Sequence, residues 1–186
     1  RAKDGTPYYV DAVVAPILGD NGKPMKYLGV RYDITAAEIE RQNARGIINA
    51  IDASYAYIEF DLGGHVIKAN KNFLQVMGYQ NDEIVGKHHR MFCEPAVSGS
   101  PAYQQFWRDL NDGKPQNDVF KRVTKSGQRV SLQAVYAPVT DEMGRVIKVV
   151  KIATDVTAAE DAAAMLRSAV EQAQIVTSAA MKGDLS

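Results

Sequence analysis

The sequence predicts an α+β protein built on an antiparallel five-stranded sheet with helices on one face. Segments rich in Val, Ile and Tyr are bounded by Gly, Asp and Asn, which is typical of strands. Several shorter segments have apolar residues at helical spacing instead. The order of these segments, two strands, three helices and three strands, favours an antiparallel sheet that the helices cover from one side.

Composition narrows the class of protein. The chain has 186 residues, 46% hydrophobic and 24% charged, which suits one domain plus extra segments. Lys+Arg and Asp+Glu are both 22, and this balance argues against nucleic acid as the main partner. The single cysteine, Cys93, excludes an intrachain disulfide and a multi-cysteine zinc site. No apolar run approaches the ~20 residues of a membrane span, so we expect a cytoplasmic segment whose full-length protein can carry an anchor elsewhere.

An internal repeat organises the chain. Residues 3–38 match residues 125–160 without a gap, at a constant offset of 122. Pro16, Asp33 and Thr35 are among the residues that recur in the second copy. We therefore expect the end of one unit, followed by a complete second unit.

The elements follow from local patterns. Both copies predict a hairpin of two long strands around an Asp- and Gly-containing turn. The hairpins are expected over residues 7–34 and 128–156. Between them we expect a helix over 36–51, strands over 55–61 and 65–70, short helices over 72–77 and 82–85, a longer helix over 101–110 and a strand over 117–124.

Each hairpin ends in Asp-x-Thr and runs directly into Thr-Ala-Ala-Glu. This pattern predicts a capping box, in which the Thr side chain accepts from the third helical N–H and the Glu reaches back to the Thr N–H. Because the pattern occurs twice, we assign Asp33, Thr35, Asp155 and Thr157 to a signal joint between a sheet and an outgoing helix.

The segment KANKNFLQVMGYQNDEIVGKHHRMFCEP resembles the core signature of PAS sensory domains. The places of that signature are held by Asn70, Phe73, Gly78, Tyr79, Glu83 and Gly86. The segments HRMFCEP, YQQFWRDLNDG and FKRVTKSG are similar to PAS domains of bacterial methyl-accepting chemotaxis proteins. The resemblance implies a PAS fold with flanking signalling helices.

The resemblance also implies a domain organisation. Residues 1–35 would be the C-terminal β-hairpin of a preceding PAS domain, and residues 36–52 a linker or N-cap helix. Residues 53–157 would be a complete PAS domain. Residues 158–186 would be a coiled-coil output helix leading toward a HAMP-like or signalling domain.

An apolar stripe supports the coiled coil. It consists of Ala162, Leu166, Ala169, Ala173, Val176 and Ala180, with spacings of 4, 3, 4, 3 and 4. This heptad spacing is typical of parallel helices, and we expect a homodimer.

The chain has no Gly-rich phosphate loop, GxSxG or HExxH motif, so we expect neither an enzyme nor a metal site. PAS domains often hold haem, flavin or a small metabolite. In light-sensing members a Cys attacks the flavin; His89 stands in its place, which excludes that adduct and leaves non-covalent flavin. Haem would need an axial histidine. His88 and His89 are the candidates, with His65 third, and at most one of the adjacent pair can point inward.

Other residues are assigned to a ligand pocket or to ordinary core. Trp107 could gate a ligand or pack in the core. The expected pocket lining consists of Ile58, Phe73, Met77, Phe120, Leu132, Val135 and Ile152. An empty core is the alternative.

These observations predict a sensory signal-transduction module of a bacterial chemoreceptor. A small ligand, a cofactor or a neighbouring domain would act on the PAS core, and the Asp-x-Thr joint would pass the change to a dimeric helical output and a downstream signalling domain. The alternatives are a PAS module of a histidine kinase or cyclic-di-nucleotide enzyme, and a ligand-free scaffold.

Overall fold

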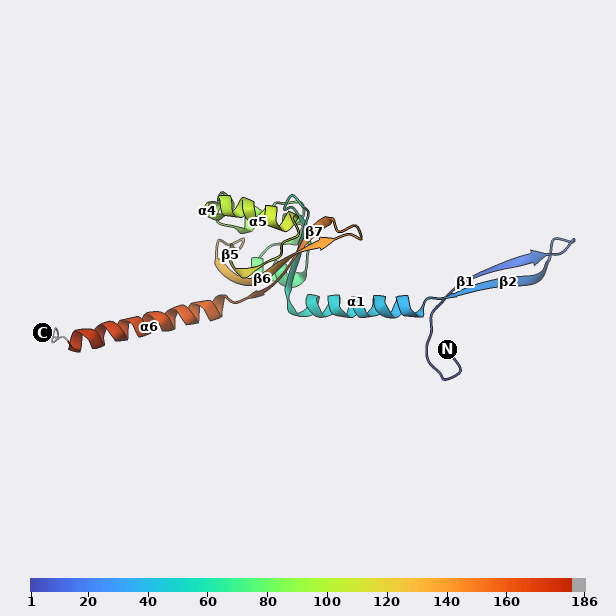
Figure 1. The fold of residues 1–186 in the computed structure, drawn as a ribbon, viewed down its shortest axis with the longest axis horizontal. Coiled ribbons are helices and arrows are strands. Elements are labelled where there is room, and N and C mark those ends of the chain that lie inside the picture. The colour runs from blue at the N-terminus through green and yellow to red at the C-terminus, as the bar shows by residue number, and fades with distance from the viewer. Residues whose placement is uncertain (182–186) are drawn as a thin grey trace. The chain divides into compact units, whose positions relative to one another are not determined.

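The computed structural model describes residues 1–181, with side chains through residue 178. The chain divides into two compact units, Arg1–Ala50 and Ile51–Ser186 (Figure 1). No helix in the described range is long and apolar enough to cross a membrane.

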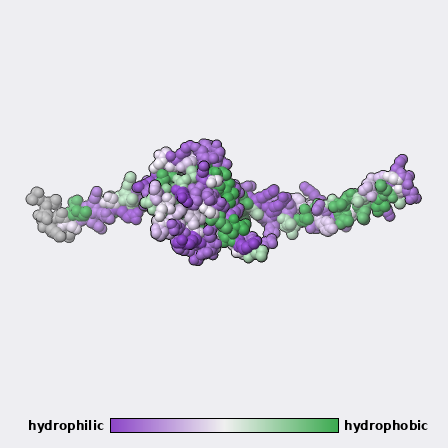
Figure 2. All heavy atoms as spheres, turned by 90° about the horizontal axis from the view of Figure 1, so that it is seen from above, coloured by the Kyte–Doolittle hydropathy of each residue, from purple (hydrophilic) through white to green (hydrophobic). Residues whose placement is uncertain are grey.

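The first unit is a two-stranded hairpin followed by a helix. Strands β1 (Val10–Leu18) and β2 (Pro24–Asp33) pair antiparallel, and a single residue separates β2 from α1 (Thr35–Ser54). Every residue of both strands is exposed. The hairpin therefore presents hydrophobic surface, which Figure 2 shows in green at its right end.

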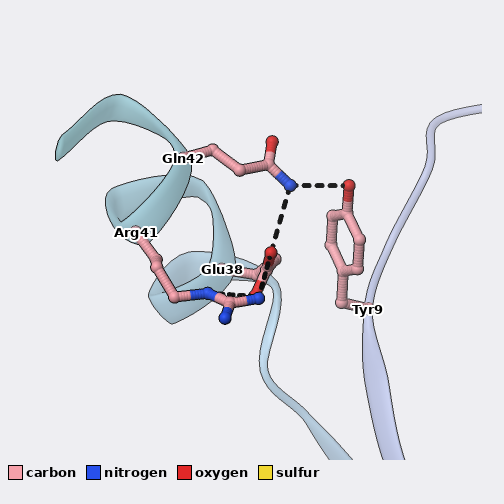
Figure 3. Close-up of polar contacts among 4 residues, drawn as sticks. All are labelled: Tyr9, Glu38, Arg41 and Gln42. Carbon is pink, nitrogen blue, oxygen red and sulfur yellow. Dashed lines mark hydrogen bonds and ion pairs between the residues drawn. The ribbon is translucent and has the colours of Figure 1, made fainter. Parts of the chain in front are cut away.

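The start of α1 is fastened to the hairpin by side chains (Figure 3). The Gln42 amide donates to the Tyr9 hydroxyl at 2.9 Å and to the Glu38 carboxylate at 3.3 Å. Arg41 pairs with the same carboxylate, which holds the pKa of Glu38 below its usual range. The Glu38 carboxylate is thus bound by two side chains of its own helix, Arg41 and Gln42.

The second unit contains a five-stranded antiparallel sheet in the order β4-β3-β7-β6-β5. Its strands are β3 (Ala56–Phe60), β4 (Val66–Ala69), β5 (Gln116–Val123), β6 (Arg129–Thr140) and β7 (Val146–Asp155). Its helices are α2 (Lys71–Met77), α3 (Asn81–Ile84), the 3₁₀ helix η1 (His89–Phe92), α4 (Pro95–Ser98), α5 (Pro101–Asn111) and α6 (Thr157–Met181).

The core lies between this sheet and the helices gathered on one of its faces, α4 and α5 among them (Figure 1). Its largest fully buried apolar side chains include Phe60, Phe73, Phe92 and Tyr136. The predicted fold class, an α+β protein with a five-stranded antiparallel sheet, is confirmed. The short helices η1 and α4 were not expected from the sequence.

The two hairpins have the same register. Val10 faces Asp33 across the first as Leu132 faces Asp155 across the second. Each ladder also shifts at the same repeat position, between Ile17 and Leu18 in the first copy and at the corresponding pair in the second. The sequence repeat is therefore a structural repeat.

Candidate functional site

The predicted joint at the start of α6 ties the helix to two strands. The Thr157 amide and hydroxyl both donate to the Asp155 carboxylate, at 2.9 and 2.5 Å. The Thr157 hydroxyl oxygen also accepts from the Ser131 amide of β6 at 2.9 Å. One residue earlier, the Val156 amide donates to the Ser131 carbonyl at 2.9 Å. The helix start is thus bonded to the end of β7 and the beginning of β6.

This geometry corrects the predicted capping boxes. The Glu160 amide donates to the Val156 carbonyl as an ordinary helical bond, and the Thr157 amide is taken by Asp155. The short Asp side chain reaches the first helical N–H directly, while the Thr hydroxyl is turned toward β6.

The first copy repeats this joint in its own unit. The Thr35 amide donates to Asp33 at 2.9 Å, and the Thr35 hydroxyl oxygen accepts from the Tyr9 amide at 2.9 Å. The Ile34 amide donates to the Tyr9 carbonyl at 3.0 Å. All three contacts match the second copy.

Most of the predicted pocket residues lie in the core of the second unit. Those that are buried there are Ile58, Phe73, Met77, His89, Trp107 and Leu132, and Phe120 packs against them. Ile152 and Val135 do not lie in the core. They pair with each other across β7 and β6, and Val135 is on the opposite face of β6 from the buried Leu132, Ala134 and Tyr136. Both side chains line a groove on the outer face of the sheet, where Val135 is 40% exposed.

Of the two adjacent histidines, only His89 is fully buried. Its Nδ1 lies 2.9 Å from the Tyr103 hydroxyl, and its Nε2 lies 2.9 Å from the Tyr136 hydroxyl. Burial holds the pKa of His89 well below its usual range, and the nearby Arg122 and Lys151 lower it further. A neutral imidazole therefore joins α5 to β6 through two tyrosines.

His88 lies at the edge of the core. Its Nδ1 accepts from the Arg90 amide at 3.1 Å, which caps η1. Its ring meets His65 edge to face at 5.2 Å between centroids and packs beside Trp107 at 6.2 Å. Burial lowers the pKa of His88, as does Arg90.

His89 does not fit haem ligation in this arrangement. An axial ligand needs a ring nitrogen with a free lone pair aimed at iron. Both nitrogens of His89 already face tyrosine hydroxyls, and its ring is surrounded by Phe60, Phe106 and Trp107. Residues 1–181 also contain no group of three or more His, Cys, Asp or Glu placed to share a metal ion.

Sequence reasoning missed the buried charges of the second unit. Arg122, Lys151 and Glu59 are all buried. Glu59 is paired with Lys148 at 2.8 Å and Lys68 at 3.2 Å. Among the residues whose side chains are described, Arg122 and Lys151 form no ion pair. The sequence signal for Lys151 was its position: it lies two residues from Val149 and two from Ala153, so all three side chains are on the same buried face of β7.

The chain was compared with known proteins. The family described as PAS fold matches residues 66–153. The chain is similar to Biofilm dispersion protein BdlA of Pseudomonas aeruginosa, with 39% identity over 155 residues, 83% of this chain and 37% of that protein. It is also similar to the Aerotaxis receptor of Escherichia coli, with 31% identity over 103 residues, 55% of this chain and 20% of that protein.

A solved light-oxygen-voltage domain, studied with a flavin analogue, superposes with a TM-score of 0.54 at 21% identity. The match covers 68% of this chain and 96% of that one. At this identity the likeness concerns the fold alone. The chain spans well under half the length of either curated relative.

Proposed function

Residues 66–153 belong to the PAS family, and from this premise we propose that the chain is the sensory part of a bacterial chemoreceptor. One relative supports the receptor class, since it is named an Aerotaxis receptor. The other is named a Biofilm dispersion protein. The proposed role is non-enzymatic: a small ligand in the core biases the sheet, and the helix after Thr157 carries that bias onward.

The observation that carries this proposal is the joint. Because Thr157 is bonded both to Asp155 at the end of β7 and to Ser131 at the start of β6, it senses the relation between these two neighbouring strands. Both strands also line the core, through Tyr136 and Val149 among others. A change in core packing that shifts β6 against β7 therefore alters the direction in which α6 leaves the sheet.

The partners follow from the same reading. We propose that α6 pairs with α6 of a second copy and leads into a downstream signalling domain. Leu166 and Val176, on the predicted stripe, are exposed in the single chain and so are free to meet a partner helix. Ala180 of the stripe and residues 182–186, at the end of the expected output helix, lie outside the residues whose side chains are described.

The test uses the full-length receptor in cells, with the stimulus-dependent change in swimming reversal as the readout. Asp155→Ala and Thr157→Ala should uncouple or lock the output, while Thr157→Ser, which keeps the hydroxyl, should respond normally. Circular dichroism of the purified variants must show that the PAS core remains folded. Normal responses in both Ala variants, at normal expression, would overturn the joint as a signalling element.

A further inference from the structure

A cleft separates the beginning of α6 from the sheet of the second unit. It has a volume of about 650 Å³, and it is lined by residues of β5, β6 and α6 together with Glu94, the N-cap of α4. Ser131 and Thr157 are among the lining residues, so the hydrogen bond of the joint lies at the wall of the cleft. The cleft is therefore the space that narrows or widens when α6 changes direction at the joint.

The face of α6 that borders the cleft is not the face with the predicted stripe. Glu160, Ala164 and Arg167 line the cleft. At 3.6 residues per turn, these three residues share one side of the helix. Leu166 and Ala169 of the stripe fall on the opposite side. One face of α6 is thus turned toward its own unit, while the stripe stays available to a second copy.

Charged side chains come to the cleft from both of its walls. The sheet and the segment before α4 contribute Lys121, Arg129 and Glu94, and α6 contributes Glu160, Asp161 and Arg167. The Arg129 Nε lies 2.6 Å from the Glu94 Oε1. Among the described side chains, the other four form no ion pair. Two carboxylates of α6 therefore share the cleft with a guanidinium that a different carboxylate holds.

The pair of Glu94 and Arg129 links the helices over the core to the strand of the joint. Glu94 directly follows the buried Cys93, and its side chain makes no cap bond to α4. Arg129 is the first residue of β6, two residues before Ser131. Its side chain is 77% exposed, so the pair is weak and is readily exchanged for another. A shift of the segment around Glu94 relative to β6 would release the guanidinium.

We propose that Arg129 is a latch with two positions. It pairs with Glu94 in the described arrangement, and it pairs with Glu160 or Asp161 once Glu94 is withdrawn. The second pairing draws the beginning of α6 toward β6. A guanidinium suits this exchange, because it stays charged and offers several N–H donors to a carboxylate. This inference rests on the proposed sensory function, and it adds a second connection between the core and the output helix.

The other two cations of the cleft act in opposite directions. Lys121, on the wall formed by the sheet, attracts the carboxylates of α6. Arg167 lies on α6 about two turns beyond Glu160, and it repels Arg129 and Lys121. Closure is therefore favoured at the first turn of α6 and opposed further along, so the helix tilts instead of moving as a whole.

The experiment measures distances across the cleft of the 186-residue chain by pulsed electron paramagnetic resonance. Spin labels are attached through Gln128→Cys, just before β6, and Gln172→Cys on α6. Both residues are exposed and lie outside the cleft lining. The Cys93 thiol is buried, and burial raises its pKa, so it does not compete for the label. Dilution with unlabelled chain restricts the measurement to distances within one chain.

Glu94→Gln releases Arg129 and should increase the population of shorter distances roughly two- to fivefold, as expected from the loss of one exposed ion pair. Addition of both Glu160→Gln and Asp161→Asn should return the distribution to that of the wild type. Glu171→Gln is the matched control, because Glu171 is an exposed carboxylate of α6 outside the cleft lining. Added to Glu94→Gln in place of the other two changes, it should leave the increase as it is.

Unchanged distances in Glu94→Gln would overturn the latch. An increase that persists when Glu160 and Asp161 are both neutral would overturn it as well. The proposed sensory function is judged separately, because the swimming response of the joint variants does not depend on whether Arg129 exchanges its partner.

Discussion

The amide of Ser131 donates a hydrogen bond of 2.9 Å to the hydroxyl of Thr157. The first residue of α6 is therefore bonded to β6, although α6 follows β7 along the chain. Replacing Thr157 by Ala removes this acceptor and the hydrogen bond from the Thr157 hydroxyl to the Asp155 carboxylate. We expect the free energy of unfolding in urea to fall by about 1 kcal/mol. Thr157→Ser, which retains the hydroxyl, should lose less than half of that. Equal losses in the two variants would assign the effect to the missing methyl group instead.

The buried His89 should make the domain sensitive to mild acid. Its pKa is lowered well below 6.5 by burial, so below pH 6.5 the unfolded chain binds a proton that the folded chain does not. Stability is therefore unaffected by this group above pH 6.5. It is lost as the pH falls from there toward the folded pKa, at up to about 1.4 kcal/mol per pH unit.

His89→Gln should flatten this dependence between pH 6.5 and 5, measured as Tm against pH. The other groups near His89, namely Arg122, Lys151 and His88, remain in the variant. Gly144→Ala, which lowers stability without removing a titratable group, should keep the wild-type slope. A slope in His89→Gln as steep as in the wild type would contradict the assignment.

Asn70 joins α2 to β3 and to the residues before it. Its Oδ1 accepts from the amides of Tyr57 and Phe73, both at 2.9 Å, and its Nδ2 donates to the Tyr55 carbonyl at 2.8 Å. Asn70→Ala loses the N-cap and three further bonds, the third being the donation from Nδ2 to the Asp52 carboxylate at 3.3 Å, and we expect a loss of about 2–3 kcal/mol in urea unfolding. Asn70→Asp keeps the two acceptor bonds and should retain at least half of that stability. If it were no more stable than Asn70→Ala, the acceptor bonds would not be the source.

Gly64 is required by both its backbone and its neighbours. Its φ is +81°, and a Cβ there would lie 3.1 Å from the His88 Nε2 and 3.1 Å from the Trp107 Cζ2. Gly144 has a similar φ of +77° with open space around it. Gly144→Ala should cost about 1 kcal/mol through backbone strain alone, and Gly64→Ala at least about 2 kcal/mol. If differential scanning calorimetry gave equal losses of stability for the two variants, the rings of His88 and Trp107 would move aside at no cost in free energy.

The stripe on α6 predicts a weak homodimer of this chain that forms with increasing concentration. Leu166 lies on the stripe and is 67% exposed, while the adjacent Met165 lies off it and is 73% exposed. Leu166→Lys should shift the chain toward monomer in sedimentation equilibrium, and Met165→Lys should not. A monomer at every concentration in the unaltered chain, and in one extended beyond residue 186, would exclude the parallel coiled coil.

Much of the fold was predictable because its determinants are local. The Asp- and Gly-containing turns fixed the hairpins, and the gapless repeat fixed their common register, as Val10 with Asp33 and Leu132 with Asp155 demonstrate. The helices η1 and α4, of four residues each, were not predicted, although the equally short α3 was, over 82–85.

The site was less predictable because it depends on which face of a strand points inward. In β6 both faces carry apolar residues, Leu132 and Ala134 on one and Val135 and Ala137 on the other, so alternation alone does not choose between them. The inward phase places Lys151 in the core and Ile152 outside it. The capping boxes failed for a related reason, since the sequence does not show that the Thr157 hydroxyl has a strand amide within reach.

The shared register of the two hairpins also shows where the copies have diverged. Gly29 faces Val14 in the first hairpin as Lys151 faces Tyr136 in the second, so the first copy has no cation at that position. Both copies nevertheless retain the Asp, the Thr and the strand amide of the joint. The two copies thus share the hydrogen bonds of the joint but differ at the position that Lys151 occupies in the second, so under the proposed sensory function one kind of joint would serve units whose sheets carry different residues.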